Sequence, residues 1–314
     1  MRKPSKDIDV RHPVAETVID TVSEAVIGKT EKIELVLVSV LAGGHVLLED
    51  VPGVGKTLLV RALASALGMP YKRVQFTPDL LPGDVLGVSV YDAREGRFRF
   101  QPGPIFTHIL MADEINRATP KTQSALLEAM EERRVTIDGT THPLPHPFFV
   151  LATQNPVEYE GTYPLPEAQL DRFLLKISLG YPDPADEEVL LERYGRRDDV
   201  PLPEPRLDRE GLLRLMAERE AVYVAPEVRK ILLEIIRRTR QDRRLRLGAS
   251  PRATIAYFRA VQARALVRGR DYAVPDDVYA LARAVLAHRV VIDPTAAFDG
   301  VSAEQVLDDL VGRG

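Results

Sequence analysis

The hydrophobic and polar positions divide the chain into a part that alternates helices with strands and a part that contains helices alone. In the first part, apolar residues recur at helical spacing over 14–26, 31–42, 58–64 and 120–133. Five short segments between them are typical of strands, most of them apolar as in buried parallel sheets: 46–51, 71–76, 105–114, 148–153 and 174–179. This alternation predicts an α/β core with a parallel sheet and flanking helices.

The second part shows no further strand pattern. Pro201, Pro203 and Pro205 form a stiff linker. Helices are expected in the following segments: 185–194, 208–220, 226–241, 251–268, 275–288 and 302–311. We therefore predict an α/β core over residues 1–181, opened by a polar arm at 1–12, and a smaller all-α lid domain over residues 182–314.

A turn-rich stretch over residues 77–104 interrupts the core. It contains an expected hairpin of residues 89–92 and 97–100, and a second hairpin is expected from Val135 onward. An insertion of this length inside a compact core is more often functional than inert, although an inert surface excursion is the alternative.

The glycine loop after the first strand indicates a phosphate-binding P-loop. It contains Gly53, Val54, Gly55, Lys56 and Thr57, and Leu58 opens the helix that follows. Glycines let the backbone curl around an anion, and the loop N–H groups and the lysine would bind that anion. The threonine hydroxyl suits Mg²⁺.

Two further features surround this loop. In the pattern G-x-x-x-x-G-K-[ST] a glycine would stand where this chain has Asp50, so we expect the loop to leave the strand by a different turn. Upstream, Ile27 and Gly28 lie in a small turn that would suit an adenine ring, although a plain helix–helix turn is the alternative.

Acidic and amide residues follow two other strands. Asp113 is expected to hold Mg²⁺ and Glu114 to polarise an attacking water, which is the Walker B pattern of hydrolysing P-loop proteins. Asn155 ends a third strand and could touch the γ-phosphate, because ligands of parallel sheets bind at that edge. An asparagine that merely starts a turn before proline is the alternative.

Two arginines are candidates for phosphate contacts. Arg172 is either a solvated ion-pair partner of Asp171 or Glu167, or an arginine finger for a neighbouring subunit's nucleotide. Arg252 stands in the first turn of a helix capped by Ser250, where the helix dipole disfavours a cation, and could reach a nucleotide between core and lid. A plain surface arginine is the alternative there.

Composition narrows the possible functions. Apolar residues make up 45% and charged residues 28% of the 314 positions, with a net charge of -4 and no cysteine. These values exclude thiolate chemistry and give no overall attraction to nucleic acid or membranes. No secretory signal or spanning segment is evident, which favours a cytoplasmic protein. The basic cluster at 237–246 lacks interleaved aromatics, so a solvated helix end is favoured over nucleic-acid binding.

Together these motifs resemble the AAA+ ATPases, and more closely the MoxR family of the helix-2-insert clade. The resemblance rests on four segments in this order: 113–118, 152–156, 165–173 and 248–253. It implies a P-loop AAA+ core followed by a lid, with Walker A at Gly53–Thr57, Walker B at Asp113 and Glu114, sensor 1 at Asn155, an arginine finger at Arg172 and sensor 2 at Arg252.

The same resemblance implies ATP and Mg²⁺ as cofactors, and a homo-oligomeric ring, usually a hexamer. MoxR proteins are similar to chaperones that remodel or activate partners, often ones with a von Willebrand factor A domain. Three alternatives stay open: a nucleic-acid motor similar to minichromosome maintenance helicases, a magnesium-chelatase-type ATPase subunit, and an ATP-dependent switch or scaffold with negligible turnover.

Overall fold

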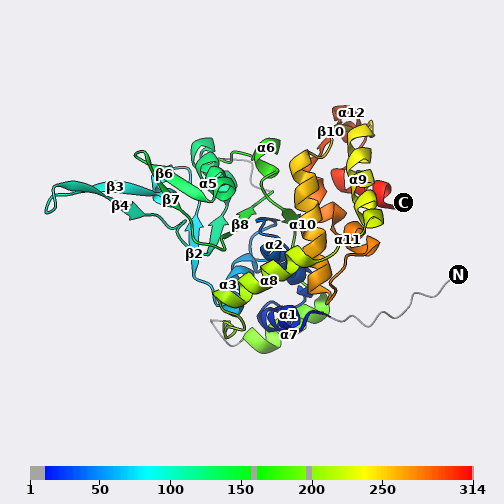
Figure 1. Ribbon diagram of the computed structural model, residues 1–314, viewed down its shortest axis with the longest axis horizontal. Helices are drawn as coiled ribbons and strands as arrows, with labels where there is room; N and C mark the ends of the chain where they lie inside the picture. The colour runs from blue at the N-terminus through cyan, green and yellow to red at the C-terminus, as the bar shows by residue number, and fades with distance from the viewer. Residues whose placement is uncertain (1–10, 157–160, 196–199, 313–314) are drawn as a thin grey trace.

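A five-stranded sheet forms the centre of the first part of the protein in the computed structural model, which describes residues 11–156, 161–195 and 200–312 (Figure 1). All neighbouring strands pair in parallel, in the order β2-β5-β8-β1-β9. Their bounds are β1 (Val46–Glu49), β2 (Tyr71–Gln75), β5 (Ile109–Asp113), β8 (Phe149–Gln154) and β9 (Leu175–Ile177). The predicted α/β core with a parallel sheet is confirmed.

Successive side chains of the strands point to opposite faces of the sheet and enter two separate hydrophobic clusters. Ile109 and Met111 of β5 pack in one cluster, whereas Leu110 and Ala112 pack in the other. The first cluster includes residues of α1 (Pro13–Ala25), α2 (Thr30–Leu41) and α3 (Lys56–Ala66), and the second includes residues of α5 (Pro120–Glu132). Both faces are therefore covered, which explains the continuous apolar runs of the strands.

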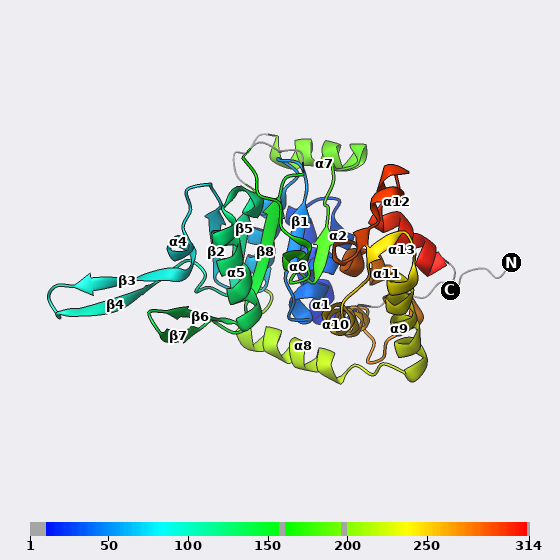
Figure 2. The same cartoon turned by 90° about the horizontal axis from the view of Figure 1, so that it is seen from above.

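Two hairpins project from one end of the molecule, opposite the helical domain (Figures 1 and 2). The longer one pairs β3 (Gly87–Asp92) with β4 (Arg97–Pro102) and follows the short helix α4 (Pro82–Leu86), and the shorter pairs β6 (Arg134–Ile137) with β7 (Thr140–Pro143). The rings of Phe100 and His142 stack with centroids 4.0 Å apart, so the two hairpins contact each other. Both hairpins agree with the sequence prediction.

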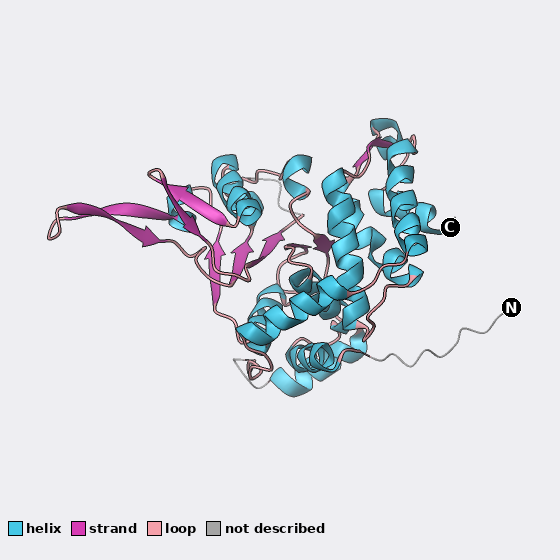
Figure 3. Ribbon diagram, viewed as in Figure 1, coloured by secondary structure: helices cyan, strands magenta, loops and turns pink. Residues whose placement is uncertain are grey.

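The chain after the sheet is a helical lid domain, as predicted (Figure 3). Its elements are α7 (Pro184–Tyr194), α8 (Arg209–Ala221), α9 (Pro226–Gln241), α10 (Pro251–Val267), α11 (Pro275–Leu286), η2 (Ala287–Arg289), α12 (Pro294–Phe298) and α13 (Ala303–Gly312). Helices α8, α9, α10, α11 and α13 of the lid share one hydrophobic cluster with α1, α2 and α3. The boundary between core and lid near residue 181 therefore stays a prediction from the sequence.

The lid and the start of β5 differ from the sequence predictions. The lid contains one short antiparallel pair, β10 (Leu245–Leu247) with β11 (Val291–Ile292), where we expected no strand; these runs are too short to show a period. Strand β5 begins at Ile109 instead of residue 105. The preceding residues form a turn, in which the Phe106 amide donates to the Gly103 carbonyl and the Thr107 hydroxyl donates to the Pro70 carbonyl. Residues 1–10 of the predicted arm lie outside the described residues.

Within the described ranges, no helix combines the length and the apolar character that crossing a membrane requires.

Two buried histidines join separate parts of the fold. His45 precedes β1, accepts a hydrogen bond from the Val150 amide at 3.0 Å and contacts the Met130 carbonyl at 3.3 Å. His288 of η2 contacts the Phe173 carbonyl at 2.9 Å. Burial lowers the pKa of His45 from 6.5 to about 4 and that of His288 from 6.5 to about 3. Both side chains are therefore neutral in the folded protein near neutral pH.

We expect the folded state to lose stability as the pH falls from about 6.5 toward 4. In that window the unfolded chain binds protons at both histidines and the folded chain does not, so the free energy of unfolding falls by at most about 1.4 kcal/mol per pH unit for each histidine. Urea unfolding between pH 7.5 and 4.5 measures this slope. His288→Gln should reduce the slope by about one histidine's share, and an unchanged slope would contradict the assignment.

Candidate active site

Three neighbouring strands bring the predicted P-loop, acidic pair and asparagine to one edge of the sheet. The P-loop follows β1, Asp113 and Glu114 end β5, and Asn155 follows β8. These segments line one cavity of about 390 Å³. Its lining residues are Pro52, Gly53, Gly55, Lys56, Thr57, Leu58, Arg73, Asp113, Glu114 and Asn155. The cavity lies at the carboxyl ends of parallel strands, where such folds bind ligands.

The P-loop has the backbone that its glycines predict. Gly53 and Gly55 adopt φ values of 87° and 92°, a left-handed conformation that side chains disfavour. Lys56 curls back and donates from Nζ to the carbonyls of Asp50 at 2.6 Å and Val51 at 3.2 Å. Burial lowers the pKa of Lys56, against the opposing influence of Asp50, Asp113 and Glu114. The loop thus presents its amides and the start of α3 to the cavity.

Asp50, which departs from the usual P-loop pattern, fastens the loop to the neighbouring strand. Its buried carboxylate accepts hydrogen bonds from the Ser178 hydroxyl at 2.7 Å and from the amides of Leu179 at 2.5 Å and Gly180 at 3.2 Å. A glycine could make none of these contacts. The sequence pattern marks Asp50 only as a departure, because its donors lie about 130 residues away in the chain.

Asp113 contacts a basic side chain that the sequence analysis missed. Arg73 of β2 donates from Nε to the Asp113 carboxylate at 3.0 Å, and the Thr153 hydroxyl donates to its other oxygen at 2.6 Å. Since Asp113 and the Thr57 hydroxyl line the same cavity, their oxygens fit the ligand set that Mg²⁺ prefers. The ion would then have to compete with Arg73 for the carboxylate.

Glu114 is held at the end of β5 by three contacts. Its backbone adopts a φ of 55°, and its amide donates to the Thr153 hydroxyl at 2.9 Å. Its carboxylate accepts from Gln75 at 2.6 Å and from Arg117 at 3.1 Å, both on Oε2. Gln75 is also new to the site, although the two-residue period of β2 places it on the same face as Arg73.

The turn proposed for adenine does not line this cavity. Gly28 has a φ of 72°, and a side chain there would overlap the carboxylate of Asp186 in α7. Lys29 donates to the Tyr181 carbonyl at 2.9 Å, so the turn packs against the start of the lid. The role of Ile27 and Gly28 in binding adenine stays a prediction.

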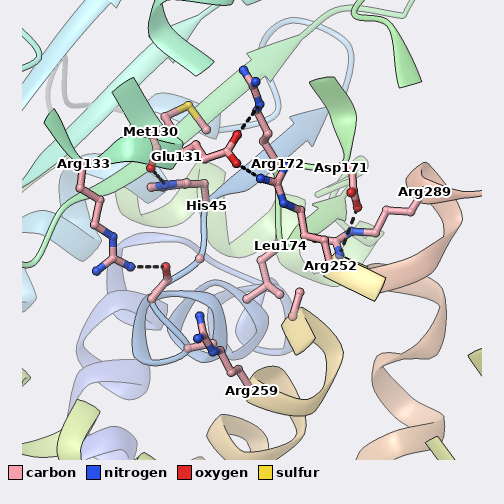
Figure 4. A pocket seen from close by; sticks show the side chains of 14 residues that line it. His45, Met130, Glu131, Arg133, Asp171, Arg172, Leu174, Arg252, Arg259 and Arg289 are labelled. Carbon is pink, nitrogen blue, oxygen red and sulfur yellow. Dashed lines mark hydrogen bonds and ion pairs between the residues drawn. The ribbon is translucent and has the colours of Figure 1, made fainter. Parts of the chain in front are cut away.

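Arg172 and Arg252 lie together in a different cavity, of about 170 Å³ (Figure 4). Gly44 and His45, which precede β1, line this cavity, whereas the P-loop follows β1. The two cavities are therefore at opposite edges of the sheet, one at the carboxyl ends and the other at the amino ends of the strands. The four residues of β1, or about 13 Å of strand, separate them. The structure does not place Arg252 beside the P-loop of its own chain, because α10 begins at the other edge.

Neither ion-pair partner that we considered for Arg172 is found. Arg172 pairs with Glu131 of α5, and Arg252 contacts the other oxygen of the same carboxylate. Both arginines are partly exposed, with 26% and 43% of their side-chain surfaces accessible. Glu131 was not singled out from the sequence, because an acidic residue at the end of an amphipathic helix carries no distinguishing signal.

Arginines of the basic cluster at 237–246 make contacts within the lid, and Arg246 lies 3.8 Å from Glu167 of the core. Arg238 pairs with Glu234, Arg244 pairs with Asp242 and Asp309, and Arg240 donates to the Ala249 carbonyl. The carboxylates beside Arg244 raise its pKa. These contacts favour a structural role over nucleic-acid binding.

Comparison with known proteins agrees with this architecture. Residues 45–175 match the family model "ATPase family associated with various cellular activities (AAA)", and residues 237–310 match the AAA lid domain. A crystal structure from Cytophaga hutchinsonii, named only as an ATPase candidate, superposes with a TM-score of 0.89 at 38% identity, covering 96% of this chain and 94% of that one.

Curated relatives span most of the chain. The protein named chaperone MoxR1 of Mycobacterium tuberculosis is 44% identical, over 93% of this chain and 80% of the relative. Protein MoxR of Paracoccus denitrificans is 34% identical, over 86% of each chain. The uncharacterized protein YeaC of Bacillus subtilis is 50% identical, over 96% of this chain and 94% of the relative.

Replacing Asp50 with alanine should lower both the melting temperature and the affinity for nucleotide. The change leaves three donors without their acceptor and frees the P-loop from β9, at a cost of about 1–3 kcal/mol. Ser178→Ala removes a single donor and should cost less. Thermal unfolding and nucleotide titration measure the two effects, and an unchanged affinity in Asp50→Ala would show that the contact serves only the fold.

Proposed function

Because this chain belongs to the MoxR family of AAA ATPases, and is therefore an ATP hydrolase, we propose that it forms a ring that uses ATP hydrolysis to remodel or activate a partner protein. The name of one relative, chaperone MoxR1, supports this direction. A hexamer is the ring size that we expect, with one nucleotide at each subunit interface.

The observation that carries the proposal is that one chain holds only part of a hydrolysis site. Lys56, Glu114 and Asn155 line the P-loop cavity, while Arg172 and Arg252 lie in the cavity at the opposite sheet edge. An arginine that stabilises the charge of a transferring phosphoryl group must contact its oxygens. These two arginines therefore act on the nucleotide of a neighbouring subunit, which is the arrangement of a ring.

The residues of the P-loop cavity have distinct tasks in this proposal. The loop amides and Lys56 bind the phosphates, and Asn155 positions the terminal phosphate or the attacking water. Thr57 and Asp113 would hold Mg²⁺, which neutralises phosphate charge when bound. Glu114 accepts a hydrogen bond from the water through Oε1, because Gln75 and Arg117 both use Oε2.

We propose that the two hairpins contact the client. Side chains of β3 and β4 are unusually exposed for apolar residues, with 57% of Tyr91 and 71% of Phe98 accessible. Exposed apolar groups of this kind are typical of protein interaction sites. A client with a von Willebrand factor A domain is the first candidate.

The other functions predict different behaviour. A nucleic-acid motor needs an exposed basic track, whereas the arginines of the 237–246 cluster largely pair with carboxylates and carbonyls of the same chain. A magnesium-chelatase-type subunit would act only with its enzyme partner. A switch with negligible turnover needs no residue that activates water. Glu114 is suited to that task, because the described side chains that donate to its carboxylate both use Oε2.

Lys56→Ala should abolish ATP binding, whereas Glu114→Gln should bind ATP and hydrolyse it at least about a hundredfold more slowly. The lysine supplies charge to the bound phosphates, and the glutamate acts only on the water. Equilibrium binding and phosphate release measure the two effects. Tight binding by Lys56→Ala would contradict the P-loop assignment, and near-normal turnover by Glu114→Gln would contradict the role of the base.

Adding a client should raise the ATPase rate of the purified protein, and adding DNA should not. The comparison uses a candidate protein with a von Willebrand factor A domain, single-stranded DNA and duplex DNA at equal mass. Stimulation by DNA that falls steeply with salt would favour the nucleic-acid motor instead. Phe98→Ser should weaken stimulation by the client, while Tyr194→Phe in the distant helix α7 is a matched control.

A further inference from the structure

Glu131 bridges the two arginines that the proposed function assigns to the neighbouring subunit (Figure 4). Its Oε2 lies 3.0 Å from Nε of Arg172, and its Oε1 contacts Nη2 of Arg252. The three residues come from three separate elements: the last turn of α5, the loop before β9 and the first turn of α10. One carboxylate thus joins core and lid at this point.

The remaining charges of the cavity make this carboxylate the only described anion in contact with the pair. Asp171 accepts from the Ser250 hydroxyl at 3.0 Å and pairs with Arg289 at 3.5 Å. Arg133, Arg259 and Arg289 also line the cavity, so five guanidinium groups face two carboxylates. Like charges this close repel, and the charge of Glu131 offsets that repulsion where Arg172 and Arg252 meet.

The contact leaves part of the Arg172 guanidinium available. Among the described residues, its ion-pair partner is Glu131, which uses Nε. The two terminal nitrogens of the planar group then point away from the contact, in the fork that suits phosphate oxygens. The ion pair with Glu131, on the Nε side of the group, restricts the positions that Arg172 can take, so less freedom is lost when a phosphate binds.

We propose that Glu131 is a positioning residue that holds Arg172 and Arg252 as one pair, aimed at the nucleotide of the neighbouring subunit. This inference rests on the proposed function, because it needs the arginines to act between subunits. Glu131 itself contacts no nucleotide. Its effect reaches the reaction through the arginines of its own chain and appears at the neighbour's site.

The chain contains a matched control at the next position. Glu132 lies in the same helix turn and is similarly exposed, with 47% of its side chain accessible against 36% for Glu131. It pairs at 2.8 Å with Arg134 of β6, an arginine that does not line the cavity of Arg172 and Arg252. Glu131→Gln and Glu132→Gln remove the same charge from the same helix end.

The test uses two kinds of full-length chain that complement each other. Donor chains carry Lys56→Ala and keep the arginine pair, and acceptor chains carry Arg172→Ala and keep the P-loop. Neither chain should hydrolyse ATP alone, and mixing them should restore turnover where a donor arginine meets an acceptor P-loop. Absence of any restored turnover would contradict the action between subunits, and with it both the proposed function of Arg172 and this inference.

With restored turnover as the reference, Glu131→Gln is placed on one chain at a time. On the donor it should lower kcat about tenfold with little change in KM for ATP, because the phosphate-binding loop belongs to the acceptor. The loss should follow the donor chain and not the acceptor chain. Glu132→Gln on the donor should leave turnover at the reference level, and thermal melts confirm that all donors are folded.

Two results would overturn the inference while leaving the proposed function intact. Equal turnover with Glu131→Gln and Glu132→Gln donors would show that the contact with the arginines has no part in the reaction. Faster turnover with Glu131→Gln would show that Glu131 competes with the nucleotide for the arginines instead of positioning them.

Discussion

The direction of the five parallel strands determines where most candidate functional groups of the core lie. All five run the same way, so the residues that follow them gather at one edge and the residues that precede them gather at the other. The P-loop, the Walker B acids and Asn155 follow strands, whereas His45 and Arg172 precede them. A short strand cannot bring the two groups together, and this supports the proposal that a second copy of the chain completes the site.

Buried ionic contacts then hold the lid in the position that this arrangement requires. Glu34 of α2 pairs with Arg264 of α10 and with Arg268, which follows that helix, and Glu34 is almost fully buried. Arg289 of η2 donates to the Phe173 carbonyl at 2.6 Å, next to Arg172, and burial lowers its pKa to about 10. Removing one partner from a buried pair is strongly destabilising. The lid is thus tied to α2 through the end of α10 and to the arginine loop through η2.

The sequence predicted the parts of this site that local patterns describe. A glycine loop between a strand and a helix, and acids at the end of an apolar strand, are signals contained in a few residues, and the structure brought Lys56, Asp113 and Glu114 into one cavity. Asp50, Arg73 and Glu131 escaped because their partners lie far along the chain or on another element. Arg252 was expected to reach a nucleotide between core and lid, but its place beside Glu131 was not foreseen, because the sequence contains no information on which sheet edge the lid covers.

Helix α5 connects the two edges, which would give the proposed ring a short route between successive sites. It begins after Glu114 and Arg117, where Gln123 donates to the Ile115 and Ala118 carbonyls, and its last turn places Glu131 beside the arginine pair. Its 13 residues span about 20 Å as one rigid element. In the proposed ring, a displacement at the start of α5 would therefore reach, through a single helix, the arginine pair beside Glu131. It would also reach the β6–β7 hairpin, which starts at Arg134, so one helix links the nucleotide site, the arginine pair and this hairpin.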